Sequence, residues 1–261
     1  MREQIHKLES RYPWSSLEVD GHVWRWMDTA APGPAVLLLP GSMGDAAMFV
    51  RTLLTLGDRV RLIAVTYPAL ADPQRLAAGL KAVVDHLGLP PIVVVGSSFA
   101  AYWAQFFALA YPEQVRKLVI GNGFTDASDL ADNPLFDAGW VANTSPQDLH
   151  ASWLDKVRSA PLSPLQSLQR LMLQERQSPE NLHARFAGVT TAVACPPLPL
   201  KASDVVVLDC DDDPLIPPPA RERLRQRYPG GRHVRLASGG HYPHLLNPEA
   251  YESLLLDLAF D

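Results

Sequence analysis

The stretch PIVVVGSSFAAYWAQ, residues 91–105, decides how this chain is interpreted. After Pro91 come four consecutive β-branched residues, then Gly96, Ser97 and Ser98, and then apolar residues at helical spacing. β-branched residues favour strands, and apolar residues three or four positions apart favour an amphipathic helix. The stretch therefore predicts a buried strand, a sharp turn and a helix. The turn is either a plain connection or the support of a reactive hydroxyl.

The rest of the chain repeats this succession of strand and helix. Unalternating apolar runs, which are typical of strands buried on both faces of a parallel sheet, occupy residues 35–40, 60–68, 92–96, 115–122, 204–209 and 233–238. Helical spacing occupies residues 45–56, 72–87, 99–112 and 218–229. Alternating polar and apolar residues around Asp20-Gly21 predict a hairpin before the series begins. The expected fold class is α/β, with a mainly parallel sheet flanked by helices.

The alternation breaks once, between Asn122 and Asp204. This segment has no clear strand, several prolines, and helical patterns near residues 146–157, 164–174 and 179–186. We expect residues 1–123 and 201–261 to form the core and residues 124–200 to form a helical cap insertion. Four apolar residues of the insertion lie at helical spacing, which predicts packing within the cap more strongly than a pocket lining: Trp140, Trp153, Leu171 and Met172.

Steric demands at the turn after residue 96 distinguish its two serines. A nucleophile on a sharp strand-to-helix turn needs small residues two positions before and after it. Ser98 meets this condition with Gly96 and Ala100, whereas Ser97 would place a valine and a phenylalanine there. The free N–H groups and partial positive charge of a helix start also favour an oxyanion. Ser98 is the candidate nucleophile, and Ser97 is a candidate pocket or hydrogen-bonding neighbour.

A serine hydroxyl needs a base, and the base needs a carboxylate that orients it. In one recurrent arrangement the order along the chain is serine, acid and histidine, with the last two following late strands. VVVLDCDDDPLIPP, residues 205–218, supplies Asp213 as candidate acid and Asp212 as runner-up; a divalent-metal site in this aspartate cluster is a weaker alternative. His241 follows Gly239-Gly240 after the final strand and is the candidate base. His244 is expected to pack or hydrogen-bond beside it.

The negative oxygen formed by nucleophilic attack on a carbonyl requires backbone N–H donors. The residue after the nucleophile, Phe99, supplies one candidate donor. The loop PGSMG, residues 40–44, follows an early strand and supplies Ser42, with Met43 close by. The two glycines of this loop are equally consistent with a flexible connection.

Five segments resemble the α/β-hydrolase superfamily, and within it the maspardin-type branch: RLIAVTYP, VVDHLGLPPIVVVGSSFAAYWAQFFA, KLVIGNGFTDAS, RQRYPGGRHVRLASGGHYPH and LPGSMGDAAMF. The resemblance implies the α/β-hydrolase fold and is weak in the insertion. Maspardin is regarded as a binding partner rather than an active hydrolase, with Asn and Gln at the positions of His241 and Asp213. This chain departs from it by holding Ser98, Asp213 and His241 together. Pro40 replaces the histidine that is common in this loop, and this replacement leaves the N–H donors intact.

Composition restricts the partners that we expect. The net charge is -5 and no basic run is present, which argues against nucleic acid. No apolar run of about 20 residues is present, so we expect no membrane span. The N-terminus has no apolar core of a secretory signal, which predicts a cytoplasmic protein. Cys195 and Cys210, the only cysteines, are expected to be reduced and buried.

The leading hypothesis is a serine hydrolase that cleaves a carboxylic ester of a small molecule through an acyl-enzyme and needs no cofactor or metal. One alternative is a C–C bond hydrolase or thioesterase that uses the same three residues. Another is a non-catalytic, maspardin-like interaction protein. Dehalogenase or epoxide hydrolase chemistry in this fold would require an aspartate in place of Ser98. The sequence leaves monomer and homodimer equally open.

Overall fold

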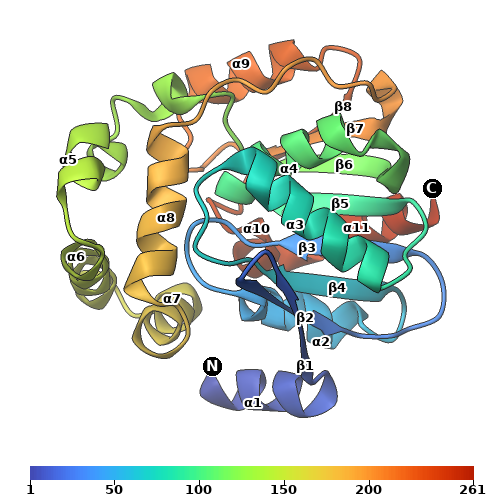
Figure 1. Ribbon diagram of the computed structural model, residues 1–261, viewed down its shortest axis with the longest axis horizontal. Coiled ribbons are helices and arrows are strands. Elements are labelled where there is room, and N and C mark those ends of the chain that lie inside the picture. The colour runs from blue at the N-terminus through green and yellow to red at the C-terminus, as the bar shows by residue number, and fades with distance from the viewer.

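The computed structural model describes all 261 residues, and eight strands form one sheet in the order β1-β2-β4-β3-β5-β6-β7-β8 (Figure 1). Hairpin β1–β2 and the pair β2–β4 are antiparallel, and every other neighbouring pair is parallel. The predicted α/β class with a mainly parallel sheet is confirmed. The strands are β1 (Trp14–Val19), β2 (His22–Asp28), β3 (Ala35–Leu39), β4 (Arg61–Thr66), β5 (Ile92–Ser97), β6 (Val115–Gly121), β7 (Val205–Cys210) and β8 (Arg232–Leu236).

Helices cover both faces of this sheet, as Figure 1 shows. Alternate side chains of a strand point to opposite faces, so Leu37 and Leu39 join the core under α3 and α4, whereas Val36 and Leu38 join the core with α1, α2 and α11. The α-helices are α1 (Arg2–Arg11), α2 (Val50–Leu56), α3 (Pro73–His86), α4 (Phe99–Ala110), α5 (Ala138–Asn143), α6 (Pro146–Ser159), α7 (Pro164–Glu175), α8 (Pro179–Thr190), α9 (Pro218–Arg227), α10 (Pro243–Leu246) and α11 (Pro248–Phe260).

The predicted hairpin and strands are present, with differences at their ends. Asp20 and Gly21 both have positive φ, 49° and 74°, as a two-residue hairpin turn between β1 and β2 requires. The apolar run 60–68 extends beyond β4 at both ends, because hydrophobicity continues into the buried loop where strand pairing has stopped. The N-terminal helix α1 was not predicted from the sequence. It contributes only Ile5 and Leu8 as buried side chains, so its apolar pattern is faint.

The segment between β6 and β7 is helical and contains no strand. In Figure 1 its helices α5 to α8 stand together at one side of the sheet. Three of them, α6, α7 and α8, begin at a Ser-Pro pair in which the serine side chain accepts a backbone N–H of the first turn. Serine is a favourable N-cap and proline is suited to the first helical position, which explains where these helices start.

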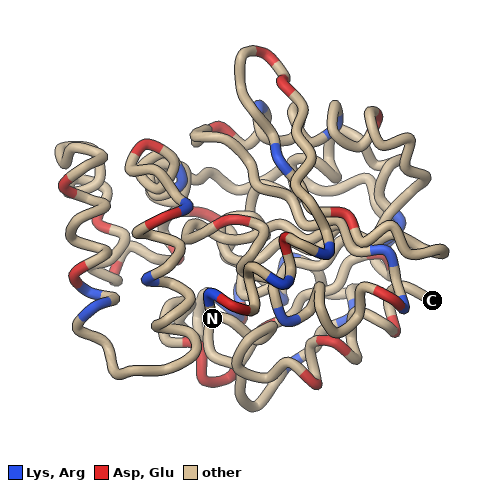
Figure 2. The backbone as a smooth tube through the Cα atoms, turned by 90° about the horizontal axis from the view of Figure 1, so that it is seen from below, with Lys and Arg blue, Asp and Glu red and all other residues tan.

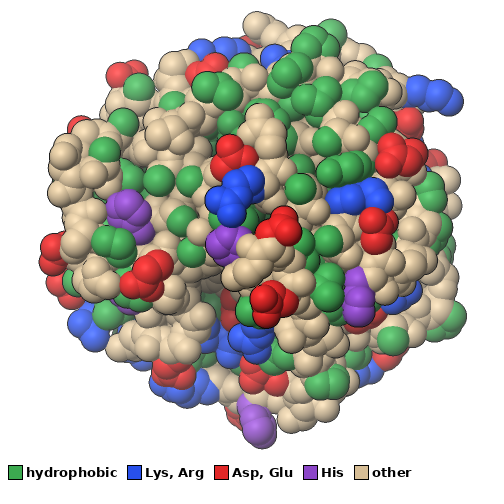
Figure 3. Space-filling view, in the orientation of Figure 1, with side chains coloured by type: hydrophobic (Ala, Val, Ile, Leu, Met, Phe, Trp, Pro, Cys, Tyr) green, Lys and Arg blue, Asp and Glu red, His purple; other side chains and the backbone are tan.

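The surface carries both signs of charge. Lys and Arg are scattered among Asp and Glu along the backbone in Figure 2, and Figure 3 shows charged and apolar side chains interspersed on one face. Both cysteines are buried and unpaired, as predicted. No helix combines the length and the apolar character that crossing a bilayer requires.

Candidate active site

Ser98 lies between the end of β5 and the start of α4 with φ 55° and ψ −119°. Positive φ is uncommon outside glycine and is held in place here by the N–H of Ser98, which donates to Gly121 O at 2.8 Å. A Cβ on Gly96 would lie 2.5 Å from the backbone oxygen of Ala100, so the turn admits no side chain at that position. The Ser98 side chain does not cap α4. Its hydroxyl is therefore not engaged as an N-cap, which is the usual role of a serine at a helix start.

Asp213 and His241 lie 28 residues apart in sequence and in contact in the structure. His241 Nδ1 is 2.9 Å from Asp213 Oδ2 and 3.2 Å from Oδ1. The N–H groups of Leu215 and Ile216 donate to Oδ1, and Asn122 Nδ2 donates to Oδ2 at 2.8 Å. Both side chains of the pair are almost fully buried. The carboxylate thus accepts hydrogen bonds from four groups, one of which is the imidazole.

The pKa of Asp213 lies below the ordinary value for an aspartate. Burial raises it, but the neighbouring His241, together with the hydrogen bonds from His241, Asn122 and Leu215, outweighs burial and lowers it. The carboxyl group is therefore ionised at neutral pH and can accept the Nδ1–H of the imidazole.

The neighbouring aspartates have other partners. Asp212, the runner-up acid, accepts the N–H groups of Gly239 and Gly240 and so holds the loop before His241. Asp209 and Asp211 form ion pairs with arginines at separate places. No three His, Cys, Asp or Glu side chains in the chain converge as metal ligands would. The metal alternative for this cluster is therefore not supported.

The loop of residues 40–44 packs directly on the turn that carries Ser98. A Cβ on Gly41 would lie 2.9 Å from Ser98 Cβ and 3.2 Å from Ser97 O, so this glycine is required by a close approach. The N–H groups of Ser42 and Met43 have no acceptor within the protein, and that of Phe99 stands unpaired at the first position of α4. The close approach at Gly41 favours a positioned loop over the alternative of a flexible connection.

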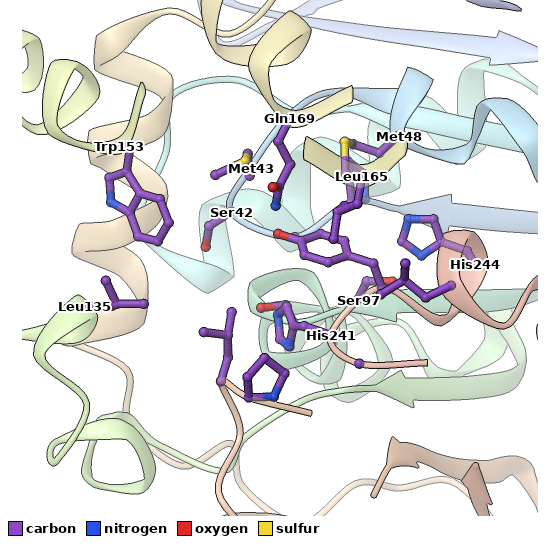
Figure 4. A pocket seen from close by; sticks show the side chains of 18 of the residues that line it. Ser42, Met43, Met48, Ser97, Leu135, Trp153, Leu165, Gln169, His241 and His244 are labelled. Atoms are coloured by element: carbon purple, nitrogen blue, oxygen red, sulfur yellow. The ribbon is translucent and has the colours of Figure 1, made fainter. Parts of the chain in front are cut away.

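A cavity of about 460 Å³ brings most of these residues together (Figure 4). Ser98, His241, Ser42, Met43, Ser97, Asp212 and His244 line it. Asp213 stands behind His241, and the Phe99 side chain is buried in the core; neither side chain lines the cavity. The insertion contributes Leu135, Phe136, Trp153, Leu165, Gln169 and Phe186. Of the four insertion residues expected to pack inside the cap, Trp153 alone lines the cavity, which corrects the prediction at that residue.

His244 packs without hydrogen bonds. Neither ring nitrogen has a partner, and the ring lies against those of Phe49, Tyr242 and Tyr251. Burial, with a smaller contribution from His241, lowers the pKa of His244 to about 3. It is a neutral side chain in the cavity wall, as the packing expectation required.

Three residues of the site's surroundings were not predicted: Asn122, Gln177 and Arg185. Asn122 follows β6 with φ 47°, a conformation that asparagine tolerates better than most residues, and donates to Asp213 and to Gly240 O. Gln177 and Arg185 belong to the insertion and reach the loop of residues 40–44. The only signal for Asn122 was its place at the end of a strand beside glycines. The other two had none, since a glutamine between two helices or an arginine on a helix is ordinarily exposed.

Comparisons with known proteins agree with this architecture. Maspardin of Homo sapiens is 27% identical over 248 residues, which covers 87% of this chain and 75% of maspardin. Among solved structures, a thermophilic esterase from Thermogutta terrifontis has a TM-score of 0.72 and 23% identity, covering 93% of this chain and 95% of that one. The enol-lactonase from Burkholderia xenovorans LB400 has a TM-score of 0.75 and 13% identity, covering 95% and 100%. These two structures share the fold with this chain, and the resemblance to maspardin is confirmed.

A family model described as "Alpha/beta hydrolase family" matches residues 36–254. That range begins in β3, includes the turn at Ser98 and both late loops, and ends within α11. Because the match extends over most of the chain and over every element that positions the cavity, the chain belongs to the alpha/beta hydrolase family.

Proposed function

We propose that this protein is a serine hydrolase that cleaves an uncharged carboxylic ester of a small molecule through an acyl-enzyme. The observation that carries the proposal is the 2.9 Å contact between His241 Nδ1 and Asp213 Oδ2, with His241 and Ser98 on the wall of one cavity. The sharp turn at Ser98 and its uncommitted hydroxyl add support. The alpha/beta hydrolase family supplies the general activity, hydrolysis.

In the proposed mechanism, Asp213 accepts the Nδ1–H of His241 and leaves Nε2 unprotonated as a base. Nε2 takes the proton of Ser98 Oγ as that oxygen bonds to the ester carbonyl carbon, and the carbonyl becomes a tetrahedral oxyanion. The N–H groups of Phe99 and Ser42 stabilise the oxyanion. The imidazolium then protonates the leaving alcohol as the C–O bond breaks. A water molecule, activated by Nε2 in the same way, releases the acid and restores Ser98.

The cavity wall supports the choice of an uncharged acyl group. Half of its 22 lining residues are hydrophobic, among them Met48, Phe49, Trp153 and Phe186, and none is lysine or arginine. A substrate carboxylate would be buried there without a cation, which is costly. We therefore favour an apolar acyl chain over the carboxylate-bearing products of ring fission, and this disfavours the C–C hydrolase alternative. The volume lies in the range of small-molecule sites.

The experiment is hydrolysis of p-nitrophenyl esters of increasing acyl length. We expect turnover by the wild type and at least a thousandfold loss in Ser98→Ala with the fold retained by circular dichroism. Ser97→Ala is the matched control, one residue away on the same cavity wall, and should still be labelled at Ser98 by a fluorophosphonate. The same acyl groups as thioesters and as amides decide the leaving-group preference. A wild type as inert as Ser98→Ala, with no labelling of Ser98, would instead support the non-catalytic, maspardin-like alternative.

A further inference from the structure

Three polar side chains, two on helix α8 and one just before it, form a stripe that faces the core: Asn181, Arg185 and Gln177. Asn181 and Arg185 lie four residues apart on α8 and therefore share one face of the helix, and Gln177, just before the N-cap Ser178, extends the stripe. Asn181 Nδ2 and Arg185 Nη2 donate to Tyr67 O, and Gln177 Nε2 is 3.0 Å from Asn181 Oδ1. The same face reaches the loop of residues 40–44, so the stripe ties the insertion to the core at this loop.

The hydrogen bonds to the loop fall on two successive peptide groups. Arg185 Nη1 donates to Gly41 O at 2.9 Å, and Tyr67 Oη donates to the same oxygen at 2.8 Å. Gly41 C=O and Ser42 N–H are the two ends of one peptide group. Gln177 Nε2 donates to Ser42 O at 2.8 Å, and Ser42 C=O shares its peptide group with Met43 N–H. Ser42 N–H and Met43 N–H thus each belong to a peptide group whose carbonyl is held by the insertion.

Two further contacts fix the orientation of these peptide groups. Gln177 Oε1 accepts Gly44 N–H at 2.7 Å, and Arg185 Nη1 also donates to Gly44 O at 2.8 Å. Gly44 has φ +86°, a conformation that suits glycine. The loop is therefore held at Gly41, Ser42 and Gly44, with both candidate donors between the anchored atoms.

Arg185 is fully buried and forms no salt bridge within the chain. Its guanidinium lies 3.8 Å from the centre of the Tyr67 ring, and Nη1 and Nη2 donate to backbone carbonyls. A buried cation without a hydrogen-bonded carboxylate is costly, and two of its three hydrogen bonds go to the loop. A charged donor on a carbonyl polarises the whole peptide group and makes the N–H at its other end a stronger donor.

We infer that Arg185 and Gln177 are positioning residues of the oxyanion site: from the insertion they orient and polarise the Ser42 and Met43 N–H groups. This inference rests on the proposed function and deepens it, because it assigns the insertion a part in transition-state stabilisation in addition to lining the cavity. It also assigns Met43 N–H as a donor beside Ser42 N–H.

The test compares Arg185→Met, Arg185→Lys and Gln177→Met in ester hydrolysis. Both methionine variants remove a donor at nearly constant length, and we expect kcat to fall roughly tenfold or more while KM changes little. Arg185→Lys keeps a charged donor and should recover part of kcat. Arg170→Met, at an exposed arginine of neighbouring α7, is the control for arginine loss and should match the wild type.

Binding of a trifluoromethyl ketone, which forms a tetrahedral oxyanion on Ser98, separates positioning from general destabilisation. Its affinity should fall in parallel with kcat in Arg185→Met and Gln177→Met, while the affinity for the unreactive alcohol analogue stays constant. Equal kcat and ketone affinity in these two variants and the wild type would overturn the inference with the hydrolase intact. A change confined to KM, or equal losses for ketone and alcohol, would overturn it as well. An inert wild type that a fluorophosphonate leaves unlabelled is a different result and counts against the proposed function itself.

Discussion

The turn at Ser98 leaves no room for side chains on the residues packed against it. A Cβ on Gly96 would meet the backbone of Ala100 and Ala101 at 2.5 to 2.7 Å, and backbone atoms of a helix start cannot yield as a flexible side chain can. We expect Gly96→Ala to lower the free energy of unfolding by about 1–3 kcal/mol, the usual cost of overpacking. Urea denaturation measures it. Gly139→Ala, on the short helix α5, is the control and should be neutral or slightly stabilising; a similar cost in both variants would contradict the steric account.

Asn122 has a different role, because its side chain joins two loops. It donates to Asp213 Oδ2 and to Gly240 O, next to His241, while its backbone stands at positive φ. Asn122→Gly keeps that backbone permissive and removes only the hydrogen bonds. We expect kcat toward esters to fall about tenfold with KM nearly unchanged, since one buried hydrogen bond is worth about 1–2 kcal/mol.

Asn122→Ala should show the same kinetic loss and an additional destabilisation of about 1 kcal/mol from backbone strain. The two variants together separate the side chain from the backbone. Unchanged kcat in Asn122→Gly would show that catalysis does not need the hydrogen bond from Asn122 to Asp213.

Candidate residues could be predicted where chain order and steric demand coincide. Ser98 could be selected from the small residues two positions before and after it. His241 and Asp213 could be selected because each follows a late strand in a fixed order. Asn122 and Arg185 could not be predicted, because their partners lie 91 and 144 residues away and no local pattern marks them. Such supports depend on the folded arrangement of loops, which a single sequence does not reveal.

At the scale of elements, two ion pairs that share Arg176 join the N-terminal helix, the insertion and the loop after β3. Arg176, at the end of α7, donates to Glu9 of α1 at 2.9 Å and to Asp45 at 2.8 Å. Asp45 is almost fully buried and also accepts the N–H of Ala47. Burial raises the pKa of Asp45 even though the positive charge of Arg176 lowers it. Arg176 is the cation that is hydrogen-bonded to this carboxylate, and Arg185 adds a smaller electrostatic attraction.

We expect Arg176→Met to cost about 3–5 kcal/mol of unfolding free energy, because it leaves a buried charge without its partner. Asp45→Asn in the same chain should recover much of the loss, since the amide still accepts the Ala47 N–H. Urea denaturation of the single and double variants measures the coupling. Arg11→Met breaks an exposed pair with Asp58 and should change the free energy of unfolding little. Equal costs for Arg176→Met and Arg11→Met would contradict the account.

Helices whose start is marked by a capping residue were predictable from the sequence, and helices without a cap and with few buried side chains were not. Asp72-Pro73 marks the start of α3, and the Asp72 side chain accepts the Arg75 N–H as an N-cap does. Helix α1 begins without such a cap and buries only two side chains. It is stabilised by contacts with α2 and with Arg176, both distant in sequence, and these are absent from any local pattern.

At the scale of the whole molecule, the sheet separates two apolar cores, and the cavity opens where the strands end against the insertion. The core behind the sheet holds Phe49, Met48 and Tyr251, and His244 is packed against it. The cavity wall and this core are therefore continuous. Because a residue of the cavity wall also packs against this core, a change in its charge affects the stability of the entire fold as well as the cavity.

His244 makes the stability of the fold depend on pH. Its pKa is lowered from 6.5 to about 3 by burial, and Tyr242, Tyr251 and His241 are the titratable side chains beside it. Below pH 6.5 the unfolded chain binds a proton at this histidine that the folded chain does not bind, so stability falls as the pH falls towards 3. From pH 7.5 to pH 5 the loss of unfolding free energy from this one group is about 2 kcal/mol.

His244→Phe, which suits the aromatic surroundings, should remove that share of the loss in urea denaturation. His6→Gln, at an exposed histidine, should keep the wild-type decline. The same decline in His244→Phe as in the wild type would mean that other groups cause it.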